Sequence, residues 1–156
     1  MKNSVIILLL IATVMSSCNN TEKQEEHEST KEVVLAQEAD ILSTAWMDDI
    51  KLNDGSKWKA NIETTEGVVK MQGLLNTQST VTIEDYHELA SKLNEVKNWL
   101  VKECTMKGPS HDNLHIWLYP LIEKIVALSE ANTLAEASEI KQSIVDNINS
   151  YTNYFQ

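Results

Sequence analysis

The chain has 156 residues, and its formal net charge is −10 because 23 acidic residues face 13 basic ones. This length allows one domain built around a single core. All of the basic residues are Lys, so the chain lacks the planar guanidinium group that grips phosphates, and its negative charge opposes contact with a phosphate backbone. We therefore expect no nucleic-acid partner.

The N-terminal segment predicts export. Lys2 precedes an apolar run from Val5 to Val14, which is too short to span a bilayer and has the length of a signal-peptide core. The run is followed by Met15-Ser16-Ser17-Cys18, which resembles the lipobox of bacterial lipoproteins. This resemblance implies cleavage before Cys18, a diacylglyceryl group on its sulfur and a fatty acid such as palmitate on its new amine. Residues 1–17 are then a signal peptide, and several acyl chains anchor the protein stably.

Residues 18–32 predict a tether between the lipid and the fold. From Asn19 to Glu32 the chain is polar and rich in Glu, without a large apolar residue. Such a segment cannot bury enough surface to offset the entropy lost on ordering. We expect the lipidated Cys18 to be followed by a flexible acidic tether, and the folded domain to cover residues 33–156.

Apolar residues return at helical spacing over residues 33–50, which favours a helix that ends before the turn signal Asn53-Asp54-Gly55. A small hairpin is the alternative, because residues 50–52 before the turn and 58–62 after it alternate between apolar and polar. An isolated hairpin is only marginally stable. We prefer the helix, followed by an ordered loop with Trp58 against the core.

A short helix is expected from Thr64 to about Asn76. Gly67 and Gly73 each cost this helix about 1 kcal/mol relative to Ala, so it has to rely on its neighbours. Its inward positions are Val68, Met71 and Leu75.

The next helix carries stronger signals. Thr82 with Asp85 three positions later is a variant of the capping box. Lys107-Gly108-Pro109 supplies the stop. Apolar positions recur between these signals at steps of three and four residues: Tyr86, Leu89, Leu93, Val96, Leu100 and Cys104.

Two further helices follow. Ser110 is expected to cap the first, and Pro120 should kink this helix rather than end it, because the apolar periodicity continues past it. Thr133 and Glu136 predict a capping box at the start of the last helix. The inward positions are Leu114, Leu118, Leu121, Ile125 and Leu128 in the first, and Leu134, Ala137, Ile140, Ile144, Ile148 and Tyr151 in the last. Short connections make successive helices antiparallel, so the sequence predicts an all-α fold, an up-down bundle of four or five helices.

The corner between the two central helices carries four side chains that bind soft transition metals: Cys104, Met106, His111 and His115. Cys104 ends one inward seam, and His111 shares a helix face with His115 at i, i+4 spacing. A tight turn at Gly108 would let the thiol and both imidazoles converge, with Met106 as a weak fourth ligand. Thiolate and thioether select Cu(I) or zinc, and imidazole suits copper and zinc. We therefore expect a copper or zinc site at this corner.

A purely structural corner remains the alternative. Free Cys often behaves as a small buried hydrophobe, and histidines in a first helical turn can simply bond to a neighbouring loop. A lone thiol in an exported protein also leaves redox chemistry at Cys104 open. The pattern Cys104-x-Met106-x-Gly108 resembles that of small uncharacterised bacterial lipoproteins, a resemblance that implies no activity.

Two functions follow as expectations. One is a lipid-anchored carrier or scavenger of copper or zinc, favoured if Cys104, His111 and His115 converge. The other is a non-catalytic adaptor that docks another envelope protein, favoured if these side chains are scattered and an apolar stripe is exposed. In either case we expect no enzymatic activity, attachment to the membrane through the lipid, and a place in the cell envelope at the outer membrane.

Overall fold

The structure is a computed structural model and describes residues 41–156. The signal peptide, Cys18, the tether and residues 33–40 lie outside the described residues. Within residues 41–156 the chain forms five helices: α2 (Trp46–Asp49), α3 (Ile62–Thr77), α4 (Ile83–Glu103), α5 (Pro109–Glu130) and α6 (Leu134–Tyr154). The predicted all-α bundle is confirmed, with four long helices and one short one.

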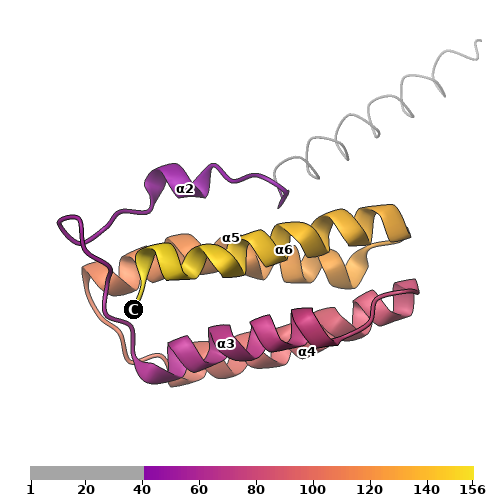
Figure 1. The fold of residues 1–156 in the computed structure, drawn as a ribbon, viewed down its shortest axis with the longest axis horizontal. Coiled ribbons are helices and arrows are strands. Elements are labelled where there is room, and N and C mark those ends of the chain that lie inside the picture. Colours follow the sequence, from indigo (N-terminus) through magenta and orange to yellow (C-terminus); the bar gives the residue numbers. More distant parts are fainter. Residues whose placement is uncertain (1–40) are drawn as a thin grey trace, which may run out of the picture. The chain divides into compact units, whose positions relative to one another are not determined.

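The four long helices form two antiparallel pairs, α3 with α4 and α5 with α6 (Figure 1). Helix α4 also packs on α5, and α6 packs back on α3, while α4 and α6 touch each other across the bundle. The short helix α2 contacts α5. Short connections between α3 and α4, α4 and α5, and α5 and α6 force this up-down order. No helix within residues 41–156 combines the length and apolarity needed to cross a bilayer.

The core follows the predicted inward positions closely. All five predicted positions of α5 are buried, as are the predicted Val68, Met71 and Leu75 of α3. Of the positions predicted for α4 and its end, Val96 and Cys104 are only half-buried, while the others are buried. The prediction for Leu134 is wrong, because 51% of this side chain is exposed. Leu134 is the first residue of α6, and α5 ends at Glu130, so Leu134 lies at the end of this helix pair.

The expected helix over residues 33–50 is wrong for its described part. Helical structure is interrupted between Leu42 and Trp46, and only the four-residue helix α2 forms beyond the break. The Ser43 hydroxyl accepts a hydrogen bond from the backbone N–H of Ala45 at 3.1 Å. Serine side chains offer the backbone such local alternatives to helical bonds, which explains why apolar periodicity alone predicted too long a helix.

The loop between α2 and α3 is ordered, as predicted, but it does not form the alternative hairpin. Its one internal bridge joins Asn53 to Ser56 around the turn. Trp58 pairs instead with the C-terminal residues: its N–H donates to the Tyr154 carbonyl at 2.8 Å, and its carbonyl accepts from Gln156 N–H at 2.9 Å. The half-buried indole packs against the core, so the loop is held by the end of α6.

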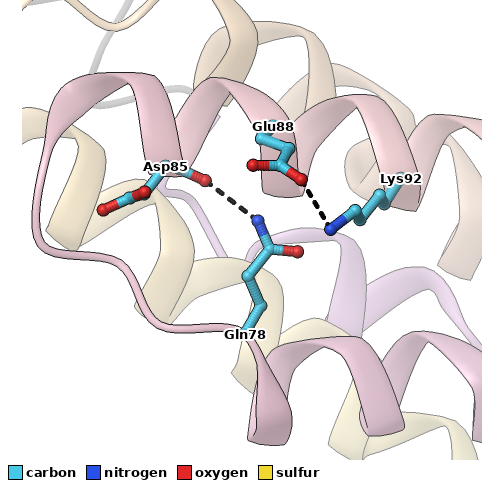
Figure 2. A network of polar contacts seen from close by, with 4 residues as sticks. All are labelled: Gln78, Asp85, Glu88 and Lys92. Carbon is cyan, nitrogen blue, oxygen red and sulfur yellow. Dashed lines mark hydrogen bonds and ion pairs between the residues drawn. The ribbon is translucent and has the colours of Figure 1, made fainter.

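The connection from α3 to α4 is held by polar contacts (Figure 2). Gln78, which follows α3, donates from Nε2 to the Asp85 carbonyl at 3.2 Å. One turn further along α4, Glu88 and Lys92 form an exposed ion pair. The predicted capping box is complete, since Thr82 Oγ1 accepts from Asp85 N–H and Asp85 Oδ2 accepts from Thr82 N–H at 2.8 Å.

The cap of α6 differs from the predicted capping box. Thr133 Oγ1 accepts from Glu136 N–H at 3.2 Å, as expected. The Glu136 carboxylate, however, accepts from Asn132 N–H at 2.9 Å, one residue before the N-cap. The carboxylate therefore ties the preceding connection to the helix instead of closing the box.

Candidate functional site

The corner that carries the predicted metal ligands is an extended connection rather than a tight turn. Helix α4 ends at Glu103, and Cys104 has extended backbone angles of φ −67° and ψ 120°. The next helix begins at Pro109, with Gly108 as N-cap at φ 63°, a conformation that favours glycine. The expected cap by Ser110 is wrong: Pro fits the first helical position because it has no N–H to satisfy there. The Ser110 hydroxyl instead donates to the Lys107 carbonyl at 3.2 Å.

Cys104 and Met106 are both half-buried, and both pack against the hydrophobic core. The thiol also acts electrostatically on Tyr151 of α6. Burial raises the pKa of the Tyr151 phenol and the nearby Cys104 adds to this rise, against the effect of the hydrogen bond that the phenol makes with Thr65. The thiol is therefore part of the packing around the core.

The two histidines lie together on one face of α5. The ring centroids of His111 and His115 are 4.2 Å apart, at an interplanar angle of 57°. Tyr119 continues the row one turn further, with its ring centroid 5.0 Å from that of His115. The Tyr119 hydroxyl lies 3.3 Å from His115 Nδ1, within hydrogen-bond distance. The i, i+4 spacing thus produces the predicted histidine pair and adds an aromatic neighbour that the sequence interpretation did not include.

The structure does not bring all the predicted ligands together. Among residues 41–156 no group of three or more His, Cys, Asp or Glu side chains is placed to hold a metal ion, so Cys104 does not join the histidines in such a group. The separation follows from the end of α4. Because Cys104 is extended, its side chain does not continue the buried face of α4. An extended connection leads from Cys104 to Pro109, in place of the tight turn that would bring the thiol to the histidines.

A second polar cluster, absent from the sequence interpretation, crosses the interface of α5 and α6. Lys124 on α5 is 1% exposed, and its Nζ donates to Asn147 Oδ1 on α6 at 3.1 Å. The same amide donates from Nδ2 to the Trp117 carbonyl at 3.2 Å, while Trp117 Nε1 donates to the Asn147 carbonyl at 2.8 Å. Burial lowers the pKa of Lys124, and the nearby carboxylates of Asp146 and Glu123 oppose this shift.

The buried lysine borders a cavity of about 280 Å³. The segment before and within α2 forms one wall with Leu42, Thr44, Trp46 and Met47, and Lys124 and Asn147 lie on the opposite elements. Trp46 Nε1 is buried and has no hydrogen-bond partner. The sequence held one signal for this site: Lys124 stands three residues after Leu121 and four before Leu128, on the apolar seam of α5, where a charged residue is out of place.

Comparison of the chain with protein-family models, with curated proteins and with solved structures finds no match.

Proposed function

We propose that the chain is a lipid-anchored, non-enzymatic binding protein of the cell envelope, and that its His111–His115 pair takes up a copper or zinc ion. The observation that carries the metal proposal is the pair itself, two imidazoles 4.2 Å apart on one face of a regular helix. Imidazole nitrogen is a ligand that suits both metals.

The surroundings of His115 fit this role. Metal-binding histidines commonly use their second ring nitrogen for an outer hydrogen bond, which holds the ring in position. Tyr119 offers such a partner at 3.3 Å from Nδ1, which leaves Nε2 for the metal. With two protein ligands, water would complete the coordination, as in open rather than closed zinc sites. This arrangement suits an exchangeable ion in a carrier or scavenger.

The proposed ligand set is narrower than the one expected from the sequence. Cys104 and Met106 pack against the core, and within residues 41–156 the thiol forms no metal-holding group with the histidines. We therefore assign these two side chains to packing, and the copper oxidation state that two imidazoles favour without a thiolate is Cu(II).

Titration calorimetry of the full chain with Cu(II) and with Zn(II) tests the metal proposal. We expect stoichiometric binding that weakens on acidification, because a protonated imidazole cannot bind a metal. His111→Ala and His115→Ala should each remove most of the affinity. His87→Ala is the matched control, since His87 lies on α4 and its Nε2 is 2.9 Å from the Ala131 carbonyl. Unchanged binding by the double variant of His111 and His115 would refute the site.

Support for the lipid anchor comes from the run Met15-Ser16-Ser17-Cys18 after an apolar segment. Replacing Cys18 with Ala should move the protein out of the membrane fraction or leave its signal uncleaved, while Cys104→Ala should change neither. Fractionation and mass spectrometry provide the readout. Unchanged membrane attachment and mass in Cys18→Ala would contradict the anchor.

A non-catalytic adaptor is the second candidate function. It is favoured by large apolar side chains that stand exposed on all four long helices and the connections: Leu52, Ile62, Val69, Val81, Val101, Tyr119, Val126 and Leu134. Such side chains are available to another envelope protein. If the histidine variants bind both metals as well as the wild type does, the adaptor becomes the leading proposal.

A further inference from the structure

Two residues that border the cavity beside α2 carry buried hydrogen-bond donors that lack full partners among the described residues. The Lys124 ammonium group has three N–H bonds, and its hydrogen bond to Asn147 accounts for one of them. Lys124 forms no ion pair within residues 41–156. Trp46 is 9% exposed, lines the same cavity and has an unpartnered Nε1–H. Buried polar groups without partners are costly, so these two donors indicate a missing acceptor.

Acidic side chains line the α6 side of the cavity. Glu139 and Asp146 are exposed acidic residues of α6 that border it. Gln142 lies between them and donates from Nε2 to Asp146 Oδ1 at 2.9 Å. The residues that line the cavity therefore include a buried lysine, a buried tryptophan with an unpartnered N–H, and two exposed acidic residues.

We propose that this cavity binds a free α-amino acid, with the ligand's carboxylate at Lys124 Nζ and Trp46 Nε1 and its ammonium group toward Glu139 and Asp146. A carboxylate supplies several acceptor lone pairs to the donors, and the ligand's own ammonium complements the acidic edge. The ligand then carries a partner of opposite charge for the lysine and for the acidic residues of the cavity.

The dimensions agree with a ligand of this size. Small-molecule pockets commonly measure from about 300 Å³ upward, so a cavity of about 280 Å³ suits a small ligand better than an extended one. Leu42 and Met47 offer an apolar wall for a side chain. A simple anion would satisfy the two donors but would leave the acidic edge uncompensated, and a simple amine would do the reverse.

The arrangement also explains why a lysine is kept in the core. An apolar residue at position 124 would continue the seam of α5 without the cost of desolvating an ammonium group. Asn147 provides one partner and is itself held by Trp117, so the lysine head is positioned before any ligand arrives. Positioning of this kind is typical of a binding site, because it reduces the ordering cost of association.

Titration calorimetry of the full chain with the standard amino acids, each tested separately, examines the proposal. We expect at least one of them to bind. Its primary amide, which lacks the carboxylate charge, and its N-acetyl derivative, which lacks the ammonium, should each bind about tenfold more weakly or worse, because hydrogen bonds to charged groups are among the strong ones. These derivatives test the zwitterion on the unaltered protein, whatever any variant does to folding.

Two variants locate the site. Lys124→Met keeps the length of the side chain and should lose about tenfold or more in affinity, and Trp46→Phe keeps an aromatic ring and should lose about threefold to tenfold. Lys97→Met and Trp58→Phe are the matched controls. Lys97 Nζ donates to Asn98 Oδ1 in an exposed hydrogen bond, and Trp58 Nε1 already donates to the Lys51 carbonyl at 2.7 Å. Both controls should bind like the wild type.

The proposal is overturned if no amino acid binds, if the amide and the N-acetyl derivative bind as tightly as their parent, or if Lys124→Met and Trp46→Phe both retain wild-type affinity. The histidine variants that test the metal site should bind the amino acid normally. Failure of one proposal therefore leaves the other standing.

Discussion

The two helix pairs of the bundle are held together by different means. Helices α3 and α4 meet through close apolar contact: a Cβ atom added to Gly67 would come 2.8 Å from Leu100 Cδ1 and 3.0 Å from Leu100 Cβ. Helices α5 and α6 meet through a buried polar network in which Asn147 bonds to both Trp117 and Lys124. The contact at Gly67 is apolar, whereas the second pair buries a polar network beside its apolar residues.

The difference separates a contact that mainly stabilises the fold from a contact that holds polar groups able to bind a ligand. Close apolar packing stabilises a helix pair without fixing any reactive or binding group. A buried network has to satisfy each polar member, and it stabilises the fold less than apolar packing of the same volume would. Its retention at α5 and α6, beside a cavity, fits a binding role for that pair.

The largest effect is expected at the polar pair. Asn147→Ala should lower the free energy of unfolding by about 3 kcal/mol, because it leaves the buried Lys124 ammonium without its partner. Chemical denaturation followed by circular dichroism measures this loss. The double variant Lys124→Met with Asn147→Leu should recover most of it, since both the buried charge and its partner are then replaced by apolar groups. If the double variant is no more stable than Asn147→Ala, the network is not what couples these residues.

Two glycine substitutions in α3 test the apolar pair. We expect them to change the stability in opposite directions, and by less than Asn147→Ala does. Gly67→Ala should destabilise the protein by about 1–2 kcal/mol, because Leu100 and the α4 backbone have to move away, and this outweighs the gain in helix propensity. Gly73→Ala is the matched control in the same helix, with no atom within 4 Å of an added Cβ. It should stabilise by about 0.5–1 kcal/mol. Equal effects at the two positions in thermal denaturation would show that the contact with Leu100 is not tight.

The smallest effect concerns the connection within the apolar pair. Hydrogen bonds from the backbone N–H groups of Thr82 and Val81 hold the pKa of Asp85 below its ordinary value of 3.8. The lowered pKa contributes stability at any pH above the pKa that Asp85 has in the unfolded chain. This stability is lost as the pH falls through the pKa that Asp85 has in the folded protein. Asp85→Asn should therefore reduce the loss of stability on acidification from about pH 5 to pH 2. Identical acid profiles for the variant and the wild type would contradict this role.

Only part of the candidate site could be predicted from the sequence, because only the histidine pair depends on local helical structure alone. The pairing of His111 with His115 needs only helical periodicity, so the sequence was sufficient to predict it. The position of Cys104 depended on whether α4 continued through residue 104, and the helix ends one residue earlier. Apolar periodicity does not single out Lys124, because one polar residue within the seam leaves the helical pattern unchanged.

The sequence by itself determined the helical class, the caps at Thr82 and Thr133, the positions of the four long helices and nearly all of their buried faces. These features depend on periodicity and on bonds between residues close in the chain, which act before any long-range contact forms. Only the tertiary structure decided that Trp58 pairs with the end of α6, that Cys104 packs against the core, and that Trp46 and Lys124 border one cavity. Each of these depends on contacts between residues far apart in the chain, whose geometry is set by how whole helices pack together.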